Sequence, residues 1–140
     1  MPLSRGVIPI RPVTAGAPAG GALADAILAE IASALHEYLD TRQNHVIDLT
    51  GMPLSREDRQ RIDAYLGQGE VSMDIHALVH SHIEETAYAG VWRVRHYDMG
   101  GGVHSERIEI IDVPEIVRAS SADMAHSARR IEALRAEEGA

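Results

Sequence analysis

Three histidines lie close together in one short segment: His76, His80 and His82. His80 and His82 are two residues apart, so in a β-strand both imidazoles would project from the same face. Neutral imidazoles bind nickel, zinc or copper, but a stable site needs three or four converging ligands. Solvent-exposed strand histidines are the simpler interpretation. The sequence therefore predicts no metal site and leaves these three histidines as weak candidates for one.

Nucleophilic catalysis has little support in the sequence. Ser81 lies between His80 and His82, but strand alternation points neighbouring side chains to opposite faces, which places them poorly for sharing a proton. The three glycines at 100–102 lack the Lys-Ser/Thr pair that completes a phosphate-binding loop. We therefore predict that the chain is not an enzyme and uses no cofactor. A small uncharacterised enzyme stays open as an alternative.

Composition and charge restrict the classes of partner. The formal net charge is −8 and the chain has no cysteine. A protein that binds nucleic acid by neutralising phosphates needs a surplus of Lys and Arg, so nucleic acid is not an expected partner. The N-terminal segment lacks the apolar run of a signal peptide, and no later segment approaches the roughly 20 apolar residues of a membrane span. We expect a cytoplasmic protein.

The length of 140 residues fits one domain. Residues 1–21 are rich in Pro, Gly and Ala and predict a flexible N-terminal arm. Residues 22–137 are expected to form a single α+β domain.

Apolar spacing predicts the elements of this domain. Residues 22–40 carry apolar side chains at helical spacing, and Ser55 can cap a second helix that ends at Gly67. Pro114 can begin a third helical region, in one or two pieces. β-Branched runs and alternation predict strands at 45–49, 71–76, 80–86, 90–97 and 103–113. The fold class expected is α+β, with a small antiparallel β-sheet packed against two to three helices in a single two-layer domain.

Four segments, spread over about the central half of the chain, resemble the motifs of a known family and occur in the same order. They are residues 66–72 (Leu-Gly-Gln-Gly-Glu-Val-Ser), 85–94 (Glu-Thr-Ala-Tyr-Ala-Gly-Val-Trp-Arg-Val), 108–110 (Ile-Glu-Ile) and 113–117 (Val-Pro-Glu-Ile-Val). The series resembles the HupH, HyaF and HoxQ family of hydrogenase expression/formation proteins, with the family-like region at about 62–118. Ala89 stands where the family usually has proline. The short length resembles a single-domain, HupJ/HoxT-like member.

The resemblance implies a non-enzymatic accessory protein or chaperone in nickel–iron hydrogenase maturation. Its expected partner is a hydrogenase subunit precursor, commonly the small iron–sulfur subunit, with other maturation proteins as further partners. A histidine-based nickel or zinc-handling protein is the alternative function.

The motif residues supply the expected binding surface. Trp92 offers a large rigid contact area if exposed, and Gly90 permits close backbone approach; filling a core that lacks Phe is the competing interpretation of Trp92. Arg93 and Arg95 can bind a client carboxylate or pair with cross-strand glutamates. An exposed sheet edge within 80–97 would favour pairing with a client strand or a homodimer. The predicted partner-binding residues are Glu70, Glu85, Tyr88, Gly90, Trp92, Arg93 and Arg95.

Overall fold

The structure, a computed structural model, describes residues 21–139. The expected N-terminal arm therefore lies outside the described residues, apart from Gly21. Within the described range, none of the helices has the length and apolar character needed to cross a bilayer.

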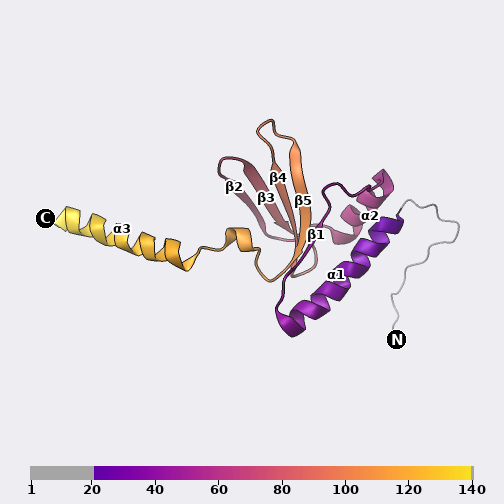
Figure 1. The fold of residues 1–140 in the computed structure, drawn as a ribbon, viewed down its shortest axis with the longest axis horizontal. Coiled ribbons are helices and arrows are strands. Elements are labelled where there is room, and N and C mark those ends of the chain that lie inside the picture. The colour runs from indigo at the N-terminus through magenta and orange to yellow at the C-terminus, as the bar shows by residue number, and fades with distance from the viewer. Residues whose placement is uncertain (1–20, 140) are drawn as a thin grey trace.

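Helices and strands follow the predicted order along the chain (Figure 1). The helices are α1 (Ala22–Thr41), α2 (Arg56–Leu66), the short 3-10 helix η2 (Glu115–Val117) and α3 (Ser121–Gly139). The strands are β1 (His45–Asp48), β2 (Ser72–His76), β3 (His80–Glu85), β4 (Val91–Tyr97) and β5 (Val103–Ile110). The prediction of an α+β fold with an antiparallel sheet is confirmed.

The five strands form one sheet in the order β1-β5-β4-β3-β2. β2 to β5 are joined by consecutive antiparallel pairings, and β1 adds beside β5, with His45 opposite Ile110. β3 and β4 are therefore interior strands. Residues 80–97 therefore offer no exposed sheet edge for pairing with a client strand or a second copy, because the two edges of the sheet are β1 and β2.

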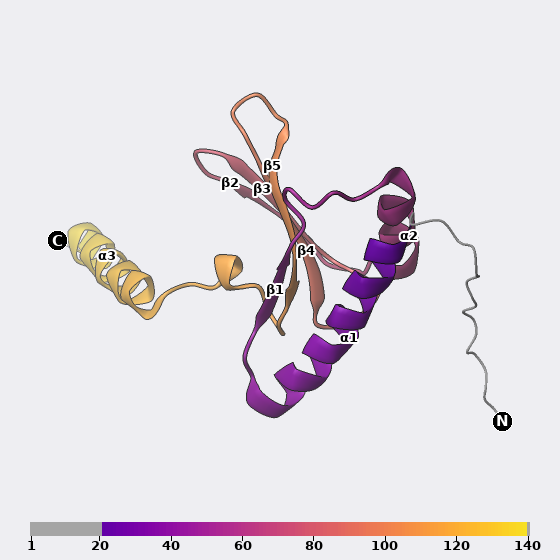
Figure 2. The same ribbon diagram turned by 45° about the vertical axis from the view of Figure 1, so that its right-hand side comes forward.

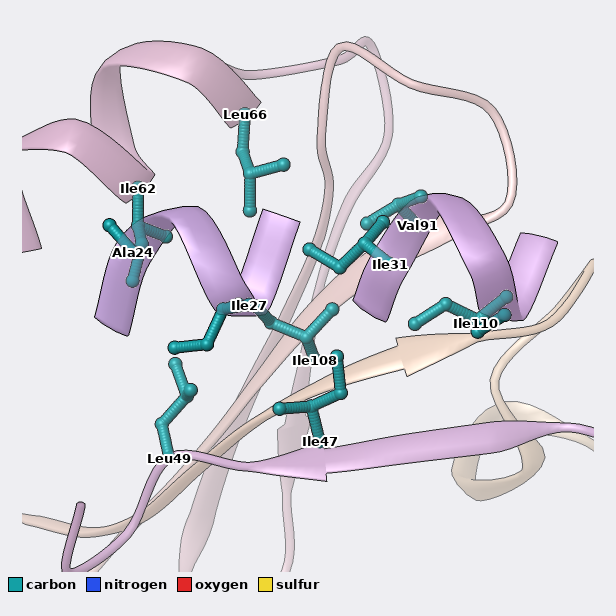
Figure 3. Close-up of a cluster of buried hydrophobic side chains, with 11 residues drawn as sticks. Ala24, Ile27, Ile31, Ile47, Leu49, Ile62, Leu66, Val91, Ile108 and Ile110 are labelled. Carbon is teal, nitrogen blue, oxygen red and sulfur yellow. The ribbon is translucent and has the colours of Figure 1, made fainter. Parts of the chain in front are cut away.

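Helices α1 and α2 cover one face of this sheet (Figure 2). The alternation of β4 and β5 points Val91, Ile108 and Ile110 toward the helices, where they pack with Ile27 and Ile31 of α1. Figure 3 shows the side chains of α1 and α2 meeting those of the strands in this cluster. Since all of these residues are nearly inaccessible to solvent, this layer is the main core of the fold.

The start of α2 is fixed by reciprocal capping. The Ser55 hydroxyl accepts a 2.9 Å hydrogen bond from the amide of Asp58, and the Asp58 carboxylate accepts one of 3.0 Å from the amide of Ser55. Asp58 Oδ1 also accepts from the amide of Ala24 at 3.1 Å. One buried carboxylate thus holds the first turns of α1 and α2 together.

The other face of the sheet carries a smaller core. Ile83, Trp92 and Val94 project from β3 and β4 and pack with Ile111, just after β5. Val117 of η2 packs against the same cluster. The segment that follows β5 therefore turns back over this second face.

Helix α3 stands apart from both layers (Figure 1). All of its residues described at side-chain level are exposed, and the helix buries none of them. The predicted third helical region exists, in two pieces, η2 and α3. However, only η2 of these two pieces packs on the sheet, through Val117, and α3 does not, so the packed part of the molecule ends near residue 118.

Candidate partner-binding surface

Backbone hydrogen bonds hold the first motif segment against the second. The amide of Gly69 donates to the carbonyl of Glu85 at 2.7 Å, and the amide of Ala87 donates to the carbonyl of Leu66 at 2.7 Å. A Cβ atom at position 69 would collide with the carbonyl oxygen of Thr86. Glycine at this position therefore lets the chain leaving α2 lie directly against the β3–β4 loop.

Glu70 and Glu85 belong to this junction. The Glu85 carboxylate accepts a 3.3 Å hydrogen bond from the amide of Glu70. Glu85 is half-buried, whereas Glu70 is exposed. Glu85 therefore helps to hold the junction, and Glu70 offers a negative charge to solvent.

The β3–β4 loop presents Tyr88 at the surface. The buried Thr86 hydroxyl donates to the carbonyl of Val91 at 2.9 Å and accepts from the amide of Tyr88 at 3.1 Å. Gly90 has a φ of +87°, and a Cβ there would lie 3.3 Å from Leu35 Cδ2. The loop is thus tight and seated on α1, while the Tyr88 side chain remains half-exposed.

Trp92 is a core residue of the chain. Only 6% of it is exposed, and it packs in the second cluster with Ile83 and Val94. Its indole Nε1–H donates to the carbonyl of Ile111 at 3.1 Å. The ring therefore offers almost no contact area to a partner in this conformation, which agrees with the core interpretation of Trp92.

Arg93 connects β4 to α2. Arg93 is 8% exposed, and its guanidinium forms a 2.6 Å ion pair with Asp63. The side chain of Asp63 is itself 61% exposed. The Nε atom of Arg93 is buried without a hydrogen-bond partner among the described residues. Arg93 does not form the predicted cross-strand pair. It lies on the sheet face that α2 covers, and it pairs with Asp63 of that helix.

Arg95 makes the expected cross-strand contacts. Its Nε lies 3.0 Å from Glu106 Oε2, and its Nη1 lies 4.0 Å from Glu84 Oε1. Arg59 of α2 reaches the other oxygen of Glu106 at 3.1 Å. Arg93 and Arg95 thus both serve contacts within the chain in this conformation.

An apolar hollow of about 230 Å³ opens beside the motif loop. We call it the tyrosine groove, because Tyr65 of α2 and Tyr88 of the loop form its rim and both are half-exposed. Its other lining residues are Leu28, Ile31, Ala32, Leu35 and Leu66. Aromatic side chains around an apolar depression are typical of protein-binding sites.

The exposed apolar surface continues along α1. Leu39 is 73% exposed and follows Leu35 by four residues, which places both on one side of the helix. Of the predicted binding residues, Tyr88 lines the groove and Gly90 adjoins it. The sequence motifs do not single out Leu35, Leu39 and Tyr65 as binding residues, although residues 22–40 carry more apolar positions than one helix face can bury.

The histidine segment forms a second surface feature. Asp74 Oδ1 accepts hydrogen bonds from His80 Nε2 at 2.7 Å and from His82 Nδ1 at 2.9 Å. The His76 and His80 rings stack at 5.0 Å, and His80 stacks on Tyr97 at 5.2 Å. The hydrogen bonds from His82 and then His80 lower the pKa of Asp74. Between residues 21 and 139, no three His, Asp or Glu side chains are grouped to hold a metal ion.

Ser81 forms a hydrogen bond with His96, and not with its sequence neighbours His80 and His82. Its hydroxyl lies 2.6 Å from Nδ1 of His96, the residue opposite it on β4. Burial, more than the nearby Arg107, lowers the pKa of His96. A serine next to a neutral imidazole is a nucleophile–base arrangement, but Ser81 is only 4% exposed. A substrate carbonyl has no access to its hydroxyl in this conformation.

Comparison with known proteins gives a consistent match. Residues 22–137 match the family described as "HupH hydrogenase expression protein, C-terminal conserved region". The chain is 33% identical over 108 residues to the hydrogenase expression/formation protein HupH of Rhodobacter capsulatus, covering 77% of this chain and 39% of that one. It is 34% identical over 89 residues to the hydrogenase-1 operon protein HyaF of Escherichia coli, covering 64% of this chain and 31% of that protein.

A solved structure agrees with the sequence relatives. The hydrogenase expression protein HupH from Thiobacillus denitrificans superposes with a TM-score of 0.74 at 40% identity. The match covers 83% of this chain and 96% of that one. The chain spans about 30–40% of the length of the curated relatives that it matches. This chain belongs to the HupH family of hydrogenase expression proteins and contains its C-terminal conserved region.

Proposed function

We propose that this protein is a non-enzymatic accessory protein of nickel–iron hydrogenase maturation that acts in the cytoplasm as a chaperone. Its client in this proposal is a hydrogenase subunit precursor, and specifically the small iron–sulfur subunit. Family membership supports a role in hydrogenase maturation. The names of the relatives describe expression or formation proteins, in keeping with an accessory role.

The tyrosine groove is the observation that carries the proposed binding activity. It is apolar, is rimmed by Tyr65 and Tyr88, and lies beside the motif loop. Tyrosines supply a large contact area at a small loss of side-chain freedom, and they are enriched among residues that dominate binding energy. An apolar helix or extended segment of an incompletely folded client would bury its side chains here.

Co-purification from the native host tests the proposal. Tagged wild-type protein is expected to retain the small-subunit precursor, identified by mass spectrometry, during hydrogen-dependent growth. The double variant Tyr65→Ser/Tyr88→Ser removes the aromatic rim without entering the core, and we expect it to lose the client.

Leu78→Ser is the matched control, because Leu78 is 87% exposed at the β2–β3 turn, away from the groove. Retention of the client by the tyrosine variant, or its loss from the Leu78 variant alone, would assign binding to another surface. Absence of any hydrogenase precursor under both aerobic and anaerobic conditions would contradict the function itself.

Metal handling by histidines is the second candidate function. The convergence of His80 and His82 on one oxygen of Asp74 favours it, since a divalent cation could replace the two bridging protons after side-chain movement. Calorimetric titration of the untagged protein with nickel and with zinc tests this candidate. Binding weaker than about 10 μM for both metals would argue against it.

A further inference from the structure

Helix α3 lacks the contacts that normally stabilise a helix in a protein. Its 19 residues pack against no other part of the described chain closely enough to bury a residue. The Ser120 hydroxyl caps its first turn by accepting a 3.0 Å hydrogen bond from the amide of Asp123. Helix propensity and a cap give only marginal stability to a helix of this length in water, so tertiary packing is the usual source of the rest.

One side of α3 is apolar. Met124, Ile131 and Leu134 are about 60% exposed each, and their spacing of seven and three residues aligns them along one face. Helices of globular proteins bury such a stripe against a partner. The stripe therefore indicates that α3 contacts another surface.

The tyrosine groove is an unfilled apolar surface of the same chain, and in this structure α3 lies away from it. η2 packs by Val117 on the sheet face opposite α1 and α2, and only residues 118–120 connect η2 to α3. Three extended residues span about 10 Å, so α3 begins close to η2 and on that side of the sheet. Figures 1 and 2 both show α3 leaving on the side away from α1 and α2.

The arginines of α3 lie close to its apolar stripe and are opposite in sign to the carboxylates of α1. Residues 22–41 contain four acidic residues and neither Lys nor Arg, whereas α3 contains three Arg, all within 129–135 beside Ile131 and Leu134, together with four acidic residues. Within the described range, Glu37 and Asp40, which flank Leu39, form no ion pair. An α3 helix beside α1 would bring Arg130 or Arg135 near these carboxylates.

We propose that α3 of one copy of this chain lies in the tyrosine groove of a second copy. Met124, Ile131 and Leu134 pack against Leu35, Leu39, Tyr65 and Tyr88 of the other copy. The two helices have similar lengths, 20 residues for α1 and 19 for α3. The contact buries both the apolar stripe of α3 and the tyrosine groove, and the protein associates with itself through this contact. The groove is shared with the proposed function, but self-association does not depend on a hydrogenase client.

Sedimentation velocity over roughly 1–100 μM full-length protein tests the contact. Wild-type protein is expected to associate, and Ile131→Glu/Leu134→Glu and Tyr65→Ser/Tyr88→Ser are each expected to sediment as monomers. Losing apolar side chains from a contact weakens association by roughly tenfold or more for each one. Ala133→Glu, on the far side of α3, is the control that should associate like wild type. Circular dichroism checks that each variant keeps its sheet and packed helices.

Mixing the two monomeric variants makes the test specific. The helix variant keeps an intact groove and the groove variant keeps an intact α3, so an equimolar mixture should form a heterodimer through one contact. A monomeric wild-type protein would overturn the proposal. Association that survives the groove substitutions would also overturn the proposal, since it would indicate that α3 of one copy pairs with α3 of the other. A mixture of folded variants that stays monomeric would also overturn it.

Client binding and self-association are read out separately. Loss of self-association in the Ile131→Glu/Leu134→Glu variant with the client retained supports the α3 contact and leaves the proposed function intact. A wild-type protein that associates in this way but captures no hydrogenase precursor supports the α3 contact and contradicts the proposed function.

Discussion

Arg93 in the middle of the sheet is paired with Asp63 on the outer surface of α2, at 2.6 Å between Nη2 and Oδ1. The arginine is almost fully buried and the aspartate is mostly exposed. One end of the pair is thus inside the fold and the other is in water. The pair ties the second helix to the central strand.

Replacing Asp63 with Ala should destabilise the protein, because it leaves the buried Arg93 charge without its partner. Loss of one partner from a fully buried pair costs about 3–5 kcal/mol, and water near the exposed position 63 reduces this to about 1–3 kcal/mol. Urea unfolding measures the change. Asp123→Ala on exposed α3 is the control, and an equal, small effect of both substitutions would show that the pair contributes little.

Trp92→Phe should retain the fold and client binding if Trp92 acts as a core residue. Phe keeps most of the apolar volume but loses the hydrogen bond to Ile111, so we expect a loss of about 1–2 kcal/mol. Trp92→Ala should lose about 3–5 kcal/mol through the cavity it creates. A Trp92→Phe protein that is as stable as wild type but releases the client would instead assign this ring to the interface.

Gly90→Ala should be more destabilising than Gly51→Ala. Both glycines have positive φ, +87° and +80°, which is unfavourable for alanine by about 1–2 kcal/mol. A Cβ at position 51 meets open space, whereas at position 90 it lies 3.3 Å from Leu35. The difference between the two midpoints of thermal unfolding measures the destabilisation that the close contact between the loop and α1 adds at position 90. Equal midpoints would mean that Leu35 moves aside without loss.

The stability of the protein should fall in acid partly through Asp58. The amide of Ser55, and then that of Ala24, stabilise the carboxylate and lower its folded-state pKa below the ordinary value of 3.8. A lowered pKa adds stability above the unfolded pKa, and this stability is lost as the pH falls through the folded pKa. Asp58→Asn should therefore be less stable than wild type near neutral pH and lose less stability below about pH 4. Parallel curves of unfolding free energy against pH for the two proteins would contradict this role.

Local pattern was sufficient to predict most elements of the fold. Residues 22–40 gave the first helix, Ser55 gave the capped start of the second, and alternation gave the meander of four strands. The position of β1 could not be predicted, because pairing between His45 and Ile110 depends on the whole sheet and not on nearby residues. The separation of α3 was missed because its apolar stripe has the same spacing as that of a packed helix.

The candidate surface was harder to predict than the fold. Trp92 and Arg93 have the residue types of binding anchors, but the second cluster covers Trp92 on one face of the sheet and α2 covers Arg93 on the other. The tyrosine groove is assembled from α1, α2 and the β3–β4 loop. Only the folded chain brings Leu35, Tyr65 and Tyr88 together. The motif residues nevertheless lead to it, because the loop that they fix carries Tyr88.

The neighbouring positions of β1 and β5 also affect how the chain is made. A nascent chain that has not yet delivered Ile110 can form α1 but cannot give β1 its neighbour. Ile27 and Ile31 then lack the strand residues that cover them. The chain up to Ile110 must leave the ribosome before α1 is fully covered, and pairing across such sequence distance is slow. During synthesis, the apolar face of α1 is therefore expected to be exposed for a time, and such exposure favours aggregation.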